Sequence, residues 1–418
     1  MATTQIPWGD GSNDKLYFEA DSMVGNQTVA VSSDPNSGAS ERSKIVNFNA
    51  SGVQPQPLQI VQLGSGGIDF DAWLKDGDTH LWINILNDYQ LDQQIRIRMI
   101  GTIDWGDGSE KVTANVTEYT TFTHTYTQKG KYRIDLHPTS GTFYLGGGNT
   151  TYNVMGTSGT NNYWRAAALY QVEIGSSIIT AITMNAFAYC YGLQRIYIPK
   201  TITELARNMF YVNSSLREII FEDETRAVTS NILNQGLYYC YSLQSISGFS
   251  LGGGTLMSAT FRNCYCLNKV TIPSTITDIA ANTFALMYGL KDFYCLPTTP
   301  PTVAAATAFS NLPADCVIYV PIGSLSAYQA KQYWSSYSSQ MVEAGAIKLS
   351  LTNVSIDNRI PMVRKNNSYT ATLTPDSGTL GTVTVKMGGV DVTNTVYSNG
   401  VITIASVTGN IEITATAA

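Results

Sequence analysis

Residues 187–198 read FAYCYGLQRIYI, and residues 210–221 read FYVNSSLREIIF. Counted from the first Phe of each stretch, apolar or small residues, and once an Asn, stand at offsets 0, 3, 6, 9 and 11. Offsets 0, 3 and 6 suit a helical or irregular turn, whereas offsets 9 and 11 suit a short strand with alternate residues buried. Each stretch therefore predicts a turn of helix followed by a strand.

The same unit recurs along the middle of the chain. Its first positions, 23 to 27 residues apart, are Phe187, Phe210, Leu237, Phe261, Phe284 and Phe309. A fixed period of this length indicates a solenoid, whose two ends need caps. Leu169, Val172 and Ile174 fit the second half of the unit and predict an N-terminal cap. The stretch VIYVPIGSLSAYQAKQYWSSYSSQMVEA (317–344) predicts a final strand and an amphipathic helix that shields the last apolar face.

These repeats, together with IYIPKTIT (196–203) and VTIPSTITDIAANTF (270–284), resemble the BspA-type leucine-rich repeat. The resemblance covers roughly residues 165 to 345, and we assign residues 148–346 to the solenoid with its caps. It implies a protein of the cell-surface, adhesin-associated class.

The N-terminal part contains short apolar runs: LYFEA (16–20), TVAVSS (28–33), KIVNFNA (44–50) and LQIVQLG (58–64). They predict a small antiparallel β domain over residues 1–64, which begins with an N-terminal docking segment. With the turn at Ser33–Gly38 and a Gln-rich last strand, the segment resembles a BACON-type immunoglobulin-like domain. That resemblance implies either carbohydrate binding or a spacer role.

Residues 65–147 predict a second β domain, with strands in HLWINIL (80–86), QIRIRMI (94–100) and FTHTYTQKGKYRIDL (122–136). In the motif IDWGDGS (103–109), Asp107-Gly108 suits a tight turn and Trp105 offers a large core anchor. Tyr126 can pack in the core while its hydroxyl finds a partner. The segment resembles the polycystic-kidney-disease-type (PKD) β-sandwich.

Residues 347–418 return to strands in YTATLTP (369–375), TVTVKMGGVDVT (382–393), GVITIASV (400–407) and NIEITATA (410–417). They resemble a small immunoglobulin-like domain found at the ends of phage tail and bacterial surface proteins. The expected fold is thus mostly β and multidomain, with small Ig-like and PKD-like β-sandwiches flanking a short α/β leucine-rich-repeat solenoid.

Composition limits the function. Hydrophobic residues make up 44% of the 418 and charged residues only 13%, with a formal net charge of −6. The sequence contains no Lys/Arg cluster that would neutralise phosphates, so we expect no nucleic-acid partner. It has no run of 18 apolar residues, and its start lacks the features of a signal peptide, so we expect neither membrane insertion nor Sec export. Six cysteines in the central region are expected to be reduced, structural thiols.

Little in the sequence predicts catalysis. His80, His124 and His137 form no metal-ligand pair, and motifs for nucleotide binding or a serine nucleophile are missing. The consecutive Glu222, Asp223 and Glu224 suit a solvated loop better than a catalytic pair. Asp104 and Asp107 allow calcium, although a turn role without metal is favoured. We therefore expect no enzyme activity, no cofactor and no metal.

Tyrosine is the most informative residue type, with 25 copies. Offset 4 of the repeat falls between buried positions, so side chains there are expected to point outwards. Stacked once per repeat, they would form an aromatic ladder that suits sugars and protein epitopes alike. The alternative is that these rings only cover the turns and pack on each other. The candidate ligand-binding residues are Tyr191, Tyr241, Tyr265 and Tyr288 at offset 4, with Tyr189 and Tyr239 beside them; Tyr211 and Tyr238 also lie near.

Modules of extracellular character without a signal peptide favour a tailed-phage virion protein, of the head-fibre, tail-fibre or capsid-decoration type. Such a protein is made in the host cytoplasm, docks on other capsid or tail proteins, and displays domains that bind host-surface or mucus glycans or a host protein. It could also be a homo-oligomer. The alternatives are a BspA-like bacterial adhesin, located extracellularly or at the cell surface, and a pure structural spacer.

Overall fold

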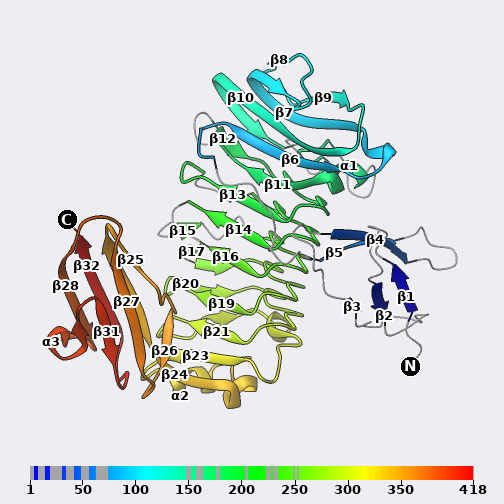
Figure 1. Ribbon diagram of the computed structural model, residues 1–418. Coiled ribbons are helices and arrows are strands. Elements are labelled where there is room, and N and C mark those ends of the chain that lie inside the picture. Colours follow the sequence, from blue (N-terminus) through cyan, green and yellow to red (C-terminus); the bar gives the residue numbers. More distant parts are fainter. Residues whose placement is uncertain are drawn as a thin grey trace. The chain divides into compact units, whose positions relative to one another are not determined.

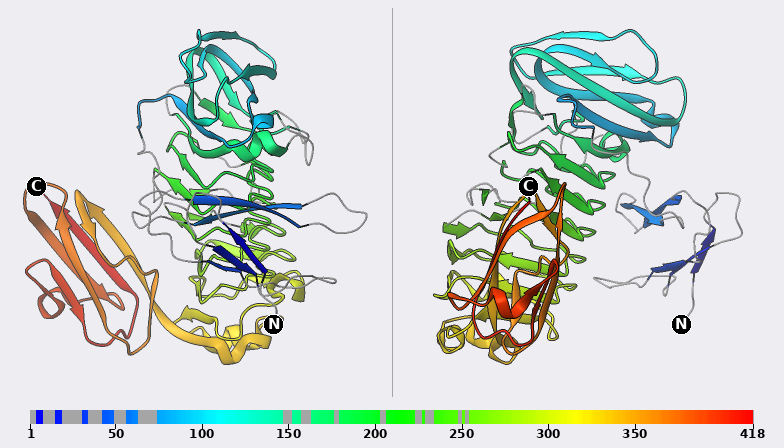
Figure 2. Two further views of the ribbon diagram at one scale, coloured as in Figure 1. Left: turned by 45° about the vertical axis from the view of Figure 1, so that its right-hand side comes forward. Right: turned by 60° about the vertical axis from the view of Figure 1, so that its left-hand side comes forward.

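The computed structural model describes most of the chain, as shown in Figures 1 and 2. Described are five strands before residue 63, then residues 74–146, 152–156, 163–175, 179–202, 206–222, 227–228, 234–247, 250–251 and 254–417. The fold is mostly β, with 43% strand and 9% helix, which confirms the predicted fold class. Contacts divide the chain into two units, Met1–Leu74 and Lys75–Ala418. Among the described residues, no helix is long and apolar enough to span a membrane.

The first unit contains two groups of antiparallel strands. Strand β2 (Lys15–Phe18) lies between β1 (Thr4–Pro7) and β3 (Val31–Ser33), and β4 (Arg42–Phe48) pairs with β5 (Gln56–Gln62). Strands β2 to β5 coincide with the four apolar runs, so the predicted antiparallel strands are confirmed. The BACON resemblance stays a prediction.

The second unit begins with a strongly paired antiparallel sheet. Strand β10 (Gly130–Leu145) lies between β6 (Thr79–Ile85) and β7 (Asp92–Asp104). The other edge of β7 pairs with β8 (Val112–Asn115) and β9 (Thr120–Thr125), and the 3₁₀ helix η1 (Asp88–Gln90) connects β6 to β7. Side chains of β7 alternate between buried and partly exposed, as a strand with one covered face requires.

The motif after β7 has the predicted geometry. Trp105 is buried, and the Tyr126 hydroxyl donates a hydrogen bond of 2.7 Å to its carbonyl oxygen. Gly106 and Gly108 have left-handed φ values of 76° and 82°, which glycine adopts without a steric penalty. The core and turn roles are confirmed, whereas the PKD resemblance stays a prediction.

The central repeats form a β-solenoid of about six turns. One row of strands, parallel within each sheet and visible in Figure 1, starts after the short helix α1 (Tyr163–Ala168). It consists of β11 (Leu169–Glu173), β13 (Arg195–Ile198), β14 (Glu218–Phe221) and β16 (Ser245–Ser247) in one sheet, then β19 (Lys269–Ile272), β21 (Asp292–Cys295), β23 (Val317–Pro321) and β24 (Met341–Thr352) in another. Shorter strands of the repeats are β12 (Ile179–Ile182), β15 (Ala227–Val228), β17 (Ser250–Leu251), β18 (Gly254–Leu256), β20 (Ile276–Ile279) and β22 (Thr302–Val303).

The core of the solenoid is the predicted one. All six first positions of the repeats are buried, and Phe187 stacks on Phe210 with the ring centroids 5.9 Å apart. The six cysteines are free thiols, of which only Cys266 is exposed, in agreement with the predicted structural role.

The two ends of the solenoid differ from each other. At the C-terminal end, α2 (Leu325–Ala330) and the 3₁₀ helix η4 (Ser335–Gln340) follow β23, and Trp334 between them packs on Phe309 at 4.8 Å. This confirms the predicted shield. At the N-terminal end, β11, which contains Leu169 and Val172 and ends just before Ile174, pairs antiparallel with β6. This segment is therefore an internal strand of a longer sheet and not a terminal cap as predicted.

The C-terminal strands form two facing sheets. Strand β24 continues out of the solenoid and pairs with β32 (Ile411–Ala417), which pairs in turn with β28 (Leu380–Met387), and β28 pairs with β29 (Val390–Asp391). The second sheet contains β25 (Val354–Ile356), β27 (Tyr369–Pro375), β31 (Val401–Ile404) and β30 (Tyr397–Ser398). The elements β26 (Met362–Arg364), α3 (Thr393–Val396) and η3 (Ala306–Phe309) complete the set.

Apolar side chains from both C-terminal sheets share one core, so this part is a β-sandwich. Contacts do not separate the second unit further, because β6 joins β11 and β24 spans residue 346. The four-part division at residues 64, 147 and 346 therefore stays a prediction.

Candidate binding surface

The segment before each strand of the solenoid is a run of turns with a regular hydrogen-bond pattern. In the first repeat, the N–H groups of Asn185, Phe187 and Tyr189 donate to carbonyl oxygens of the next repeat, at 2.8 to 3.2 Å. The residues between them bond within their own turn. Asn185 and Tyr189 have a left-handed φ of 60°, which turns alternate N–H groups toward the neighbouring repeat.

Two left-handed residues recur at offsets −2 and +2 in the next four repeats: Asn208 and Val212, Gln235 and Tyr239, Ala259 and Asn263, Asn282 and Leu286. The segment before each strand is therefore a run of irregular turns, and the predicted turn of helix is wrong. A backbone ladder between repeats fixes the turns in register, so side chains at one offset lie above one another.

The tyrosines predicted at offset 4 lie in contact where consecutive repeats carry them. The ring centroids of Tyr241 and Tyr265 are 4.8 Å apart, and those of Tyr265 and Tyr288 are 5.2 Å apart. These spacings are close to the distance between neighbouring strands, about 4.8 Å, because each ring follows the backbone ladder. Tyr288, at the end of the row, is 52% exposed.

A second group of rings joins Tyr191 to this row. Ser214 occupies offset 4 of the second repeat, so the path passes through tyrosines at offsets 1 and 2. Centroid distances along the path are 6.3 Å for Tyr191–Tyr189, 5.4 Å for Tyr189–Tyr211, 5.5 Å for Tyr211–Tyr238, 4.0 Å for Tyr238–Tyr239 and 5.5 Å for Tyr239–Tyr241. All eight rings thus form one continuous series, which we call the tyrosine ladder.

The ladder contains all six candidate residues and also Tyr211 and Tyr238, whose place in the path depends on contacts between repeats. Every ring except that of Tyr288 is half-buried. Burial raises the pKa of Tyr189, Tyr211 and Tyr241, and burial together with the hydrogen bond between Tyr238 and Tyr239 raises the pKa of Tyr238 to about 12. The Arg262 guanidinium also lies 5.2 Å from the Tyr238 ring centre. These hydroxyls stay protonated at physiological pH and can both donate and accept hydrogen bonds.

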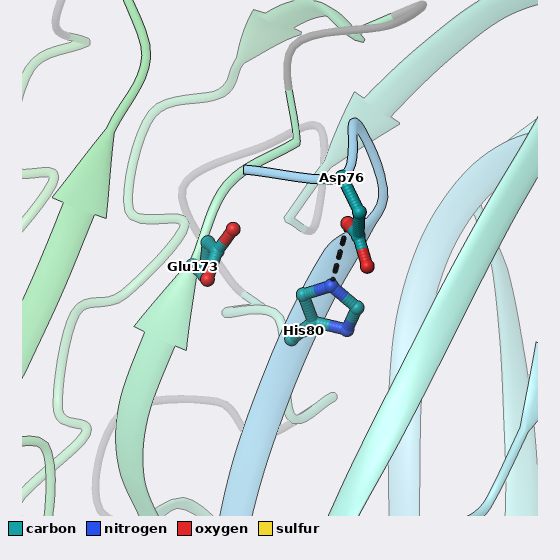
Figure 3. A group of neighbouring side chains, drawn as sticks. All are labelled: Asp76, His80 and Glu173. Carbon is teal, nitrogen blue, oxygen red and sulfur yellow. Dashed lines mark hydrogen bonds and ion pairs between the residues drawn. The ribbon is translucent and has the colours of Figure 1, made fainter. Parts of the chain in front are cut away.

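A cluster of ionisable side chains lies away from the ladder, where β11, β6 and β10 are neighbours. Glu173 and His80 are register partners, and so are His80 and Asp135. His80 Nδ1 lies 2.6 Å from Asp135 Oδ1, and His80 Nε2 lies 2.9 Å from Asp76 Oδ1. Figure 3 shows Asp76 at the ring nitrogen and Glu173 on the adjacent strand. We call Asp76, His80 and Glu173, with Asp135 behind the ring, the His80 cluster.

The charges of the His80 cluster stabilise one another. Burial acts to lower the pKa of His80, but hydrogen bonds with Asp135 and Asp76 outweigh burial and raise it. Burial likewise acts to raise the pKa of Asp135, whereas hydrogen bonds with His80 and Arg133 hold it below its ordinary value. The sequence did not reveal this cluster, because its members stand up to 97 positions apart, from Asp76 to Glu173.

The acidic candidates near the PKD-like motif have partners that suit a turn. Asp104 contacts Lys111 at 3.2 Å, and Asp107 contacts His124 at 2.7 Å. Burial acts to raise the pKa of Asp107, but hydrogen bonds with Ser109 and His124 lower it to about 2. Asp223 and Glu224 lie outside the described residues, and the Glu222 carboxylate accepts the Lys200 N–H at 3.0 Å.

A row of short parallel strands joined by buried, repeating turns defines a leucine-rich-repeat solenoid. A family model described as the BspA type leucine-rich repeat region matches residues 159–291 in six copies, so this segment is similar to repeat regions of that type. A leucine-rich cell surface protein from Faecalibacterium prausnitzii A2-165 is similar in part, with 17% identity and a TM-score of 0.28. The match covers 48% of this chain and 52% of that one, so the chain spans about half of its length. The comparison with curated proteins gave no match.

Proposed function

We propose that this protein is a non-enzymatic, adhesin-type binding protein whose tyrosine ladder contacts an extended segment of a protein on a host surface. The observation that carries the proposal is the unbroken contact of eight tyrosine rings across five repeats. Four repeat spacings of about 4.8 Å give a row roughly 19 Å long, which matches about six residues of extended chain.

Contacts between the rings favour binding, because each ring is already held by its neighbours. Ordering a side chain at an interface costs about 0.5–1.5 kcal/mol, and much of this cost is met before a ligand arrives. Tyrosine also brings a large apolar ring and a hydroxyl with only two χ angles. The BspA-type repeat region supports a surface adhesin as the protein class.

The ring geometry favours a protein ligand over a glycan. A sugar stacks on an open aromatic face, but Tyr265 has Tyr241 on one side and Tyr288 on the other. Tyr239 is likewise stacked on Tyr238 and in edge contact with Tyr241. Ring edges and hydroxyls are then the groups left for a ligand, and these suit the amides and side chains of a peptide.

The test measures attachment of the fluorescently labelled full chain to epithelial cells pretreated with protease or with periodate. We expect protease to abolish attachment, periodate to leave it, and the triple variant Tyr241→Ala, Tyr265→Ala, Tyr288→Ala to weaken it at least 30-fold, as hot-spot residues do. Tyr89→Ala is the matched control, because Tyr89 is 57% exposed and contacts the Trp164 ring but lies outside the ladder. Unchanged attachment of the triple variant would identify a spacer, and loss after periodate would identify a glycan ligand.

Cellular location separates the adhesin from the virion fibre predicted from the sequence. None of the matches described above is a virion protein, so the virion role stays a prediction. Immunogold labelling of a source culture should place the protein on intact cell envelopes. A stoichiometric signal on purified phage particles would instead establish the virion role and refute the adhesin.

A further inference from the structure

We propose that Asp76, His80 and Glu173 form a binding site for one Zn²⁺ ion, with Asp135 as a positioning residue for the His80 ring. The ligand atoms of the three residues all lie within 4.8 Å of one another, and among the described residues no other three His, Cys, Asp or Glu side chains meet in this way. The site is separate from the tyrosine ladder and does not depend on the proposed adhesin function.

The backbone brings the three ligands together. Glu173 and His80 face each other across β11 and β6, so their side chains leave the same face of the sheet. Asp76 is supplied by the turn before β6, where Lys75 and Gly77 have left-handed φ values of 53° and 95°. The turn is held to the sheet because the Lys75 N–H donates to Glu173 Oε1 at 2.8 Å.

Asp135 orients His80 in the way that metal-bound histidines require. Its carboxylate lies 2.6 Å from Nδ1 and can accept the proton there, which leaves the Nε2 lone pair directed toward Asp76. Arg133 in turn holds Asp135, with 2.7 Å between Nε and Oδ1. A carboxylate behind the imidazole fixes the ring and raises its basicity as a ligand.

The donor set and its surroundings fit zinc. One imidazole nitrogen and two carboxylates are common Zn²⁺ ligands, and water completes a tetrahedral site with three protein ligands. Zinc bonds of about 2.0–2.2 Å place two ligand atoms roughly 3.4 Å apart. Glu173 must therefore close on the other two ligands by at most about 1.4 Å, whereas His80 Nε2 and Asp76 Oδ1, now 2.9 Å apart, must separate slightly. His80 and Glu173 are buried, whereas the Asp76 side chain is 47% exposed and leaves a path for the ion.

Zinc binding also has a balanced proton exchange. In the ion-free cluster a protonated His80 can donate to both Asp76 and Asp135. Zn²⁺ takes the place of the Nε2 proton, which is released to solvent, while the Nδ1 proton stays between His80 and Asp135. The bound ion would then join β11 to the turn before β6, and so tie the solenoid strands to the preceding sheet.

The experiment measures zinc on the full chain by mass spectrometry of metal content after dialysis, and zinc affinity by titration calorimetry. We expect one Zn²⁺ per chain, proton release on binding, and a zinc affinity that decreases as the pH is lowered, because the ion must displace the proton on His80 Nε2. Asp76→Asn and Glu173→Gln should each weaken binding more than 10-fold, and Asp135→Asn by 10- to 100-fold. Ca²⁺ should not compete.

The matched control is Asp78→Asn. Asp78 lies two residues from Asp76 and contacts His137 Nδ1 at 2.6 Å, but is not part of the three-ligand group. This variant should bind zinc as the original chain does. Circular dichroism without metal checks that each variant folds, and the exposed Asp76→Asn is the variant least able to disturb the fold. Absence of stoichiometric zinc, or equal affinity of Asp76→Asn and the unchanged chain, would overturn the proposal.

Discussion

Replacing Phe284 by Ala tests whether the stacked rings at the first repeat position hold the solenoid together. Phe284 is fully buried and stacks on Phe261 and Phe309, with centroid distances of 5.6 and 6.0 Å. It also meets Phe293 edge-on at 4.9 Å. Truncating a buried Phe to Ala costs about 3–5 kcal/mol, and aromatic pairs contribute about 0.5–1.5 kcal/mol beyond their buried area. With three ring partners, we expect a loss near 5 kcal/mol.

The matched control is Phe284→Leu, because a leucine, Leu237, already occupies this repeat position in another repeat and is buried there. Phe284→Leu keeps most of the volume and loses only the ring contacts, so we expect a cost of about 1–2 kcal/mol. The assay is urea unfolding followed by circular dichroism, with the free energy of unfolding compared among the three chains. Equal losses for Leu and Ala would refute the reasoning, since Leu237 shows that the turn accepts Leu.

Three further predictions concern pH and single positions. In EDTA, the contribution of His80 to the free energy of unfolding should be complete below about pH 6.5 and should decline as the pH rises through the raised pKa of His80. Asp76 and Asp135 should contribute fully above about pH 4, and their contribution should be lost as the pH falls through their lowered pKa values. The difference in melting temperature between the unchanged chain and His80→Gln should therefore be largest between these limits; a difference constant from pH 4 to 9 would contradict it. Asn213→Ala removes a 2.8 Å hydrogen bond to the Phe187 carbonyl oxygen and should cost about 1–2 kcal/mol in urea unfolding, whereas Asn213→Cys should cost less. Gly389→Ala places a side chain at φ 84° in the turn between β28 and β29 and should lower the free energy of unfolding by about 1–2 kcal/mol. Backbone strain alone would cause this loss, because a Cβ at this position meets no other atom. An unchanged free energy of unfolding would mean that the turn changes shape.

The repeat pattern predicted the solenoid because burial acts on every unit in the same way. Residues at offsets 0, 6 and 9 must all reach one core, so their spacing is visible in any single repeat. Phe187, Leu193 and Ile196 are accordingly all buried. The strand at offsets 8 to 11 followed for the same reason, as β13 and β14 show.

Contacts between distant segments were not accessible in this way. The pairing of Glu173 with His80 depends on the register of β11 against β6, which is set by the whole sheet. A local pattern does not encode that register. The N-terminal end of the solenoid was misjudged for the same reason, because the strand that covers β11 precedes it by about 90 residues. The place of Tyr211 and Tyr238 in the tyrosine ladder likewise depends on contacts between neighbouring repeats, which the sequence of one repeat does not contain.

In three repeats, the side chain at offset 3 is small enough for the core and also donates a hydrogen bond, and the sequence alone does not separate these two requirements. The sequence predicts a packing role for the cysteines at this offset, but Asn213, Cys240 and Cys264 each donate to a carbonyl oxygen of the preceding repeat, at 2.8, 3.2 and 3.3 Å. A thiol can donate only while it keeps its proton. Burial raises the pKa of Cys240 to about 12, so the apolar core that requires a small side chain also keeps the hydrogen on sulfur. These cysteines are therefore hydrogen-bond donors of the backbone ladder, and the same burial makes them poor nucleophiles.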